Sequence, residues 1–226
     1  MAREFNIKDG DLFFRDNTWD KSIFYGDEYH LRNIPDGPKW DGDIIDIGCH
    51  IGSFSHMYYS TGTYNHIYAI EPDPHNFSIA YLNLYKGIAE ERITLFNRCV
   101  SHKNQDCYCI IPRTYTENTG GKFWKELPDQ ELPELSPYKI QSINIDDIIS
   151  IAKKPVLVKL DCEGCEIPFL TESQKLNDVA YIIGEYHCQE ENFKQIVEDV
   201  CKKWGFKHYR LIPSIENLGI FHIDRN

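Results

Sequence analysis

Long apolar runs are missing from this sequence, and so is any excess of positive charge. No run approaches the roughly 18 apolar residues of a membrane-spanning helix, and residues 1–10 lack the apolar core of a secretory signal. Lysine and arginine number 24 against 35 aspartates and glutamates, which leaves a net charge of -11. Because proteins bind duplex nucleic acid by displacing its counterions with Lys and Arg, this balance argues against a nucleic-acid partner. We therefore expect a cytoplasmic protein without a membrane span.

Internal repeats and low-complexity tracts are absent as well. Hydrophobic residues make up 42% of the 226 positions, which is enough for one sizeable core. We expect a single domain over residues 1–226, with an N-terminal extension at 1–40 and an insertion at 101–140.

The eight cysteines admit more than one interpretation. A chain of this size without a signal segment usually keeps its cysteines reduced, so we expect free thiols. The pairs Cys107/Cys109 and Cys162/Cys165 resemble halves of a zinc site, but the first has a single-residue spacer and the second follows a strand. The sequence thus predicts no metal.

Short apolar runs alternate with segments of helical spacing along the chain. The expected strands are residues 43–46, 66–71, 92–98, 155–161 and 179–185, and the expected helices are residues 53–60, 76–88, 143–152 and 190–204. This alternation predicts an α/β fold in which helices cover both faces of a mostly parallel sheet. Residues 207–212 and 218–223 are joined by a turn-length connection, which predicts an antiparallel hairpin at one edge.

Two acidic strand ends predict a nucleotide site. The first strand leads into Asp46 and a loop with Gly48 and Gly52, where glycine lets the backbone approach a ligand closely. The second strand ends at Glu71, 25 residues after Asp46, where an acidic side chain can accept hydrogen bonds from both hydroxyls of a ribose. Because ligands of open parallel sheets bind outside the carboxyl ends of the strands, we expect an adenosine-containing ligand there.

The charge of this loop indicates which adenosine compound binds. A dinucleotide pyrophosphate favours the spacing G-x-G-x-x-G, whereas this loop offers Gly48 and Gly52, and Asp46 would repel phosphate. S-adenosylmethionine carries an amino group and a sulfonium but no phosphate, so an acidic cradle suits it better. In the structural alternative, Asp46 caps the following helix and Glu71 is a solvated strand end.

These residues and two further motifs resemble the FkbM-type methyltransferases, class I enzymes that depend on S-adenosylmethionine. The resemblance covers residues 43–223 and rests on Asp-Ile-Gly-Cys-His-Ile-Gly at 46–52, Glu-Pro-Asp-Pro at 71–74, Val-Lys-Leu-Asp-Cys-Glu-Gly-Cys-Glu at 158–166 and Gly-Glu-Tyr-His at 184–187. Many class I enzymes share the first two motifs, and the third is more specific to this family. The family implies a Rossmann-like, seven-stranded, mostly parallel sheet with an antiparallel C-terminal strand. It also implies O-methylation of hydroxyls on sugars, glycans or other small metabolites.

The resemblance assigns roles to individual positions. Those implied to bind the cofactor are Asp46, Gly48, His50, Gly52, Ser53, Glu71, Pro72, Asn97, Val100, Ser101 and Asp161. Those implied to face the transferring methyl group are Asp161, Glu163, Glu185 and His187, with Lys159 beside them. His50, Cys162 and Cys165 differ in size from the family pattern, which affects local packing.

Methyl transfer to oxygen needs an aligned acceptor and a group that removes its proton. We predict that His187, at the end of the fifth strand, is this base and that Asp161, at the end of the fourth, orients it. Two carboxylates at a buried strand end, Asp161 and Glu163, are costly to desolvate without a cation, and Lys159 can supply one. In the alternative interpretation His187 is a satisfied strand-end histidine without a catalytic role.

The segment 101–140 is long and rich in exposed-looking aromatics, among them Tyr115, Phe123 and Trp124. Loops of this length are often functional, so we expect this segment to form part of the acceptor wall or a lid. An ordinary surface hairpin is the alternative.

Rival functions stay open at this point. An NAD-dependent oxidoreductase is disfavoured by the glycine pattern, and a non-catalytic adenosine-binding module would bind the cofactor without turnover. A magnesium-dependent enzyme of the catechol type needs a cluster of oxygen ligands; Asp161 and Glu185 could begin one, but nothing in the sequence completes it. A DNA or RNA methyltransferase would show a basic face. The chain could also belong to a larger glycan-synthesis protein.

Overall fold

A seven-stranded sheet forms the centre of the computed structural model, which describes residues 7–9, 12–15, 20–26, 41–61, 63–103, 106–112, 122–124, 135–154, 156–215 and 217–225. Its strands run in the order β12-β13-β11-β10-β3-β4-β5. In chain order they are β3 (Asp43–Ile47), β4 (Ile67–Ile70), β5 (Ile93–Phe96), β10 (Val156–Leu160), β11 (Val179–Tyr186), β12 (His208–Ile215) and β13 (Leu218–Asp224). β13 pairs antiparallel with β11 and β12, and the other pairs are parallel. The predicted mostly parallel sheet with an antiparallel C-terminal strand is confirmed.

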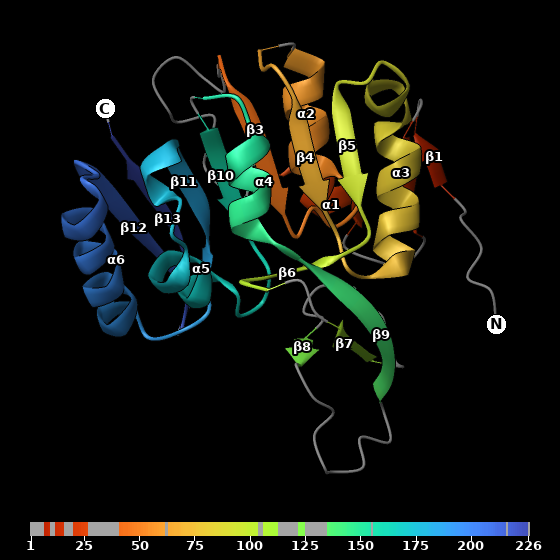
Figure 1. Cartoon of the computed structure of the whole chain (residues 1–226). Coiled ribbons are helices and arrows are strands. Elements are labelled where there is room, and N and C mark those ends of the chain that lie inside the picture. Colours follow the sequence, from red (N-terminus) through yellow and green to blue (C-terminus); the bar gives the residue numbers. More distant parts are fainter. Residues whose placement is uncertain are drawn as a thin grey trace.

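Helices cover both faces of this sheet (Figure 1). They are α2 (Ser53–Thr61) and α3 (Pro74–Ala89) on one face, and α4 (Ile145–Ile151), α5 (Glu166–Glu172) and α6 (Glu190–Trp204) on the other. Strand side chains alternate between the two cores: Ile44 packs with α2 and α3, whereas Ile45 packs with α4, α5 and α6. Asp46, two residues after Ile44, and Lys159, two residues after Leu157, therefore point toward the α2 side.

Two of the four predicted helices, residues 53–60 and 190–204, agree with α2 and α6 to within one residue, and the other two differ at their starts. α3 begins two residues early because Asp73 caps it by accepting the His75 N–H, and Pro74 suits a first turn. α4 begins two residues late because residues 143 and 144 belong to β9 (Leu135–Asn144), which runs directly into the helix. A short 3₁₀ helix, η2 (Leu176–Asp178), precedes β11.

The expected insertion contains strand structure of its own. A four-stranded sheet runs in the order β6-β9-β7-β8, with β6 (Cys99–Ser101), β7 (Asp106–Pro112), β8 (Lys122–Trp124) and β9. Figure 1 shows it projecting below the main sheet, at the end where β4 and β5 finish. Within the expected N-terminal extension lie the hairpin of β1 (Ile7–Asp9) and β2 (Leu12–Phe14) and the helix α1 (Asp20–Tyr25). In the part of the chain that the structure describes, no helix combines the length and apolar character needed to cross a membrane.

Candidate active site

The loop after β3 packs directly against the end of β10. Gly48 has a φ of +73°, and a Cβ atom there would lie 1.7 Å from the carbonyl oxygen of Asp161. Only glycine leaves room for this contact, because any side chain would collide with the backbone of Asp161. The sequence predicted that a ligand approaches the backbone at Gly48. In the structure it is the backbone of Asp161 that makes this close approach. It brings together the two strand ends that the sequence marked as functional.

A buried ion pair links the same two strands. Lys159 Nζ lies 3.3 Å from Asp46 Oδ1 and 3.8 Å from Asp161 Oδ2, and it donates to the Gly48 carbonyl at 2.6 Å. The predicted partnership of Lys159 with Asp161 is present. Asp46 is fully buried and also accepts a hydrogen bond from Ser55 Oγ at 2.6 Å. Its charge is therefore balanced inside the protein, and it does not by itself discriminate against a pyrophosphate as the sequence had indicated.

Glu71, at the end of β4, holds the loop after β3 (residues 48–52) on the side opposite β10. Its Oε2 accepts the His50 N–H at 2.8 Å, and its Oε1 accepts the Asp73 N–H at 2.9 Å. The side chain is buried, which together with the charge of Asp73 raises the pKa of Glu71 to about 8. Glu71 is therefore not the solvated strand end of the structural alternative.

The residues expected near the adenine lie around the exits of β4 and β5. Asn97 donates to the carbonyls of Glu71 and Pro72 at 2.9 and 3.0 Å, so it positions the turn after β4. Val100 and Ser101 are half-buried in β6, where the second sheet starts. Their contact with adenine stays a prediction, as does the contact of Ser53, which begins α2, with the cofactor.

The N-terminal segment contributes residues to the site that sequence reasoning missed. Arg15 donates from Nε and Nη2 to Asp20 at 2.9 and 2.7 Å and from Nη1 to Asn76 Oδ1 at 2.9 Å. Its Nη2 also lies 3.2 Å from Nε2 of His50 in the cofactor loop. Burial and the guanidinium of Arg15 lower the pKa of His50 to about 4, so this imidazole is neutral at pH 7. No local pattern marks Arg15, because all but one of these partners lie far away in the sequence.

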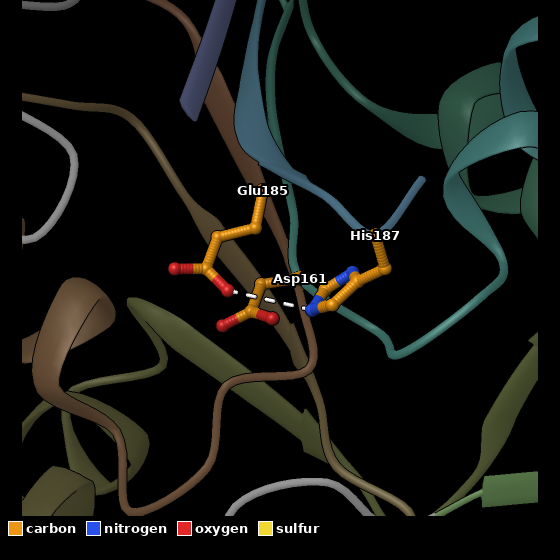
Figure 2. A group of neighbouring side chains, drawn as sticks. All are labelled: Asp161, Glu185 and His187. Carbon is orange, nitrogen blue, oxygen red and sulfur yellow. Dashed lines mark ion pairs between the residues drawn. The ribbon is translucent and has the colours of Figure 1, made fainter. Parts of the chain in front are cut away.

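Asp161, Glu185 and His187 converge at the carboxyl ends of β10 and β11 (Figure 2). The parallel register pairs Leu160 with Gly184, so Asp161 and Glu185 follow side by side. Because side chains alternate along a strand, His187 points to the same side as Glu185. One ligand-type atom from each of the three residues lies within 4.8 Å of the others. The structure thus brings three of the predicted site residues together, and their catalytic role stays a prediction.

Carboxylates surround the imidazole of His187. Its Nε2 is 3.4 Å from Glu163 and 3.5 Å from Glu185, and its Nδ1 is 3.5 Å from Glu166. Burial opposes protonation, but the hydrogen bonds and charges of these carboxylates raise the pKa of His187 to about 11. In this arrangement the ring is protonated at neutral pH, which differs from the neutral base expected from the sequence.

Glu166 braces the loop between β10 and α5, a role that the sequence motif did not reveal. Its carboxylate accepts the backbone N–H groups of Cys162 and Gly164 at 3.0 and 2.9 Å. Burial acts to raise the pKa of Glu166, but the bonds from His187 and Cys162 outweigh it and lower the pKa. At the tip of the loop Glu163 has a φ of 55°, and burial raises its pKa.

Two cysteines of this loop, Cys162 and Cys165, form a disulfide. The expectation of free thiols is therefore wrong for this pair, because the tight loop brings their Cα atoms to 5.5 Å, within the range a disulfide needs. A disulfide offers no thiolate, so this half of the zinc alternative is excluded. The cysteines found free are Cys49, Cys99, Cys188 and Cys201. The side chains of Cys107 and Cys109 lie outside the described residues.

The aromatic acceptor wall stays a prediction. Phe123 and Trp124 lie in β8, which pairs antiparallel with β7, but their side chains are outside the described part of the structure. Tyr115 is outside it altogether.

One protein-family model matches this chain. It is that of the methyltransferase FkbM domain, and it matches residues 46–219. That range starts at Asp46 and includes Asp161, Glu185 and His187. No curated protein matches the sequence.

Solved structures resemble this chain in fold. The methyltransferase FkbM from Methylobacillus flagellatus KT has a TM-score of 0.55 and 16% identity, over 81% of this chain and 43% of its own. This chain therefore spans less than half the length of that relative. TrmK from M. capricolum, solved with S-adenosyl-homocysteine, has a TM-score of 0.48 and 11% identity, over 88% of this chain and 68% of its own. At such identities the likeness to the first structure shows the fold alone.

Proposed function

This chain belongs to the FkbM methyltransferase family, and we propose that it moves the methyl group of S-adenosylmethionine to a hydroxyl oxygen of a small acceptor of the sugar or glycan class. The contact between Gly48 and Asp161 carries the proposal. It sets the cofactor loop beside the group of Asp161, Glu185 and His187. A methyl donor held by the loop would present its sulfonium to that group.

The charge of the site supports a sulfonium donor. Asp161, Glu163 and Glu185 converge beside the loop, and carboxylates at close range attract a cation and repel phosphates. We assign the ribose hydroxyls to Glu71, which would exchange part of its contact with the loop for them. Asn97, Val100 and Ser101 would line the adenine.

The chemistry asks little more of the protein than alignment and proton removal. The sulfonium is a good leaving group, so the acceptor oxygen must be held in line with the methyl group and lose its proton. His187 Nε2 lies within 3.5 Å of both Glu163 and Glu185, close enough for ring and carboxylates to share protons. Because the ring is already protonated in this arrangement, we assign the acceptor's proton to a carboxylate of Glu163 or Glu185, which the ring holds in place, with these residues acting as a unit with Asp161.

Removing members of this group should lower turnover without removing the cofactor. We expect His187→Ala and Asp161→Asn to reduce methyl transfer by roughly 100- to 10,000-fold, the usual effect of losing a positioned acid or base. The rate is measured with isotope-labelled S-adenosylmethionine and a panel of sugar acceptors. His102→Ala is the matched control, because His102 also faces a glutamate, Glu172, at 3.5 Å but lies outside the site. Full activity in both site variants would contradict the assignment.

The cofactor itself is tested by calorimetry. The purified protein is titrated with S-adenosylmethionine, S-adenosylhomocysteine and NAD in the presence of a chelator. Binding of the two sulfur compounds without NAD supports the proposal. Binding of NAD alone would overturn it and leave only the fold.

A further inference from the structure

We propose that Asp161, Glu185 and His187 form a binding site for a divalent metal cation. The sequence offered two of these ligands, and the fold adds the third. Two carboxylates and one imidazole present ligand atoms within 4.8 Å of one another. Their side chains are 23%, 17% and 23% exposed, so the group is partly shielded yet open on one side. Three protein ligands with an open side are the usual arrangement of a metal site that also binds a substrate.

The orientation of His187 distinguishes this group from an ordinary acidic cluster. Its Nε2 faces Glu185, while its Nδ1 faces Glu166 at 3.5 Å. Metal-binding histidines typically give their second ring nitrogen to a carboxylate, which holds the ring in place. Glu166 is itself buried and held by the N–H groups of Cys162 and Gly164. Glu166 thus lies behind the ring, while Nε2 on its other side lies 3.4 Å from Glu163 and 3.5 Å from Glu185.

The charge balance gives a second, independent argument. Among the described residues, the ion pairs of this region join five carboxylates to two cationic side chains, those of Lys159 and His187. The carboxylates are those of Asp46, Asp161, Glu163, Glu166 and Glu185. Lys159 is shared between Asp46 and Asp161 and also donates to two backbone carbonyls. Partly buried carboxylates in such excess are costly unless a cation joins them. A divalent ion bound by Asp161, Glu185 and His187 supplies that charge and takes the place of the ring proton on His187, which is released on binding.

The ligand set indicates the class of metal. Imidazole with two carboxylates suits first-row ions such as Mn²⁺ and Zn²⁺, whereas Ca²⁺ prefers six to eight oxygens. Cis ligands around such an ion lie roughly 3 Å apart, given bond lengths of about 2.1 Å. The three ligand atoms lie within 4.8 Å of one another, a wider spacing than this. The partly exposed side chains must therefore move slightly closer together when the ion binds.

The role of the cation rests on the proposed function. In the proposed function the acceptor hydroxyl lies beside Asp161, Glu185 and His187. A cation there would bind the acceptor oxygen, and two neighbouring hydroxyls of a sugar could share the open coordination positions. The binding site itself does not depend on this role.

The test is a metal titration of the full chain. Protein stripped with chelator and exchanged into metal-free buffer is titrated with Mn²⁺, and the free ion is followed by electron paramagnetic resonance. We expect one site per chain. Asp161→Asn, Glu185→Gln and His187→Ala should weaken binding at least 10-fold, and Glu166→Gln should weaken it about 10- to 100-fold through the ring that it orients. His102→Ala should bind as the wild type does.

Two results would overturn the inference: no Mn²⁺ or Zn²⁺ binding by folded wild-type protein, or equal binding by all the ligand variants. Circular dichroism and urea unfolding confirm that each variant is folded. The two proposals can fail separately, because cofactor binding and methyl transfer are also measured in the presence of chelator. A chain that transfers methyl groups but binds no metal contradicts only the cation site.

Discussion

At the scale of single residues, Gly48 joins the two halves of the site. Its lack of a Cβ atom lets the loop after β3 rest on the backbone of Asp161, and the carbonyl of Gly48 accepts a hydrogen bond from Lys159. The loop after β3 and the end of β10 are therefore held as one unit. A change at this position should affect both.

Gly48→Ala should destabilise the folded protein far more than the positive φ of this position alone would explain. Gly205 has the same φ of +73° but only Arg225 within 4 Å, so Gly205→Ala carries the conformational strain without the collision. We expect Gly205→Ala to lower the free energy of unfolding by about 1–2 kcal/mol and Gly48→Ala by more than about 4 kcal/mol. Urea unfolding measures both. Similar losses in the two variants would show that the contact with Asp161 is unimportant.

The buried Lys159–Asp46 pair makes a second prediction at this scale. Lys159→Met removes the cation and leaves the fully buried Asp46 without it. We expect the free energy of unfolding to fall by about 3–5 kcal/mol, the usual cost of stranding one member of a buried pair. The double variant Lys159→Met/Asp46→Asn should recover part of the loss, because the buried charge is gone. Urea unfolding of the single and double variants tests this, and a single variant as stable as the wild type would refute it.

At the scale of elements, the strand β2 is tied to the cofactor loop through α3. Asn83 accepts the Phe13 N–H at 2.7 Å and donates to the carbonyls of Phe13 and Ile51 at 3.1 and 2.9 Å. Phe14 is buried against Ile51 and Ile79. The N-terminal hairpin is therefore part of the site's support, and it delivers Arg15 to His50.

Asn83→Ala should release this attachment. It leaves buried backbone groups of Phe13 and Ile51 without their partner, so we expect a loss of about 1–3 kcal/mol in the free energy of unfolding. The Phe13 amide should exchange its hydrogen faster, and affinity for S-adenosylmethionine should fall because the loop loses a support. Asn65→Ala is the control, since Asn65 is exposed and its side chain donates to the carbonyl of Asp41. Unchanged exchange at Phe13 would contradict the attachment.

At the scale of the whole molecule, stability should fall as pH rises from 6.5 to 8. Folded Glu71 keeps its proton up to about pH 8, whereas the unfolded side chain loses it near 4.5, so unfolding releases a proton in this range. His187 also makes stability fall as pH rises. Its protonated ring stabilises the folded protein fully below pH 6.5, the ordinary pKa of histidine, and this contribution is lost as the pH rises toward about 11, the pKa of His187 in the folded protein. Each proton changes the free energy of unfolding by at most about 1.4 kcal/mol per pH unit.

Urea unfolding at several pH values between 6.5 and 8 measures this slope. Glu71→Gln should flatten it, because glutamine does not titrate. A slope that is unchanged in Glu71→Gln would show that Glu71 has an ordinary pKa in the folded protein.

Much of the fold was predictable, because strands that are buried on both faces of the sheet consist of nearly continuous apolar residues. Continuous runs such as Val156–Leu160 mark parallel strands flanked by helices, and the short connection between β12 and β13 marks the antiparallel hairpin. The second sheet was not predicted, because the strands β6, β7, β8 and β9 are short or irregularly spaced and carry no clear alternation. The disulfide was missed because Cys-x-x-Cys spacing alone does not report how a loop turns.

The sequence by itself determined which acids and which histidine stand at strand ends: Asp161 follows one apolar run, and Glu185 and His187 sit two residues apart on another. Local spacing suffices for this, since alternation along a strand sets the side of each residue. Only the tertiary structure decided which charges meet. Arg15 bonds to Asn76 across 61 positions, and Lys159 bonds to the carbonyl of Ile47 across 112. Such contacts depend on how strands pack side by side, so the burial of Asp46 and the ring of carboxylates around His187 have no local signature in the chain.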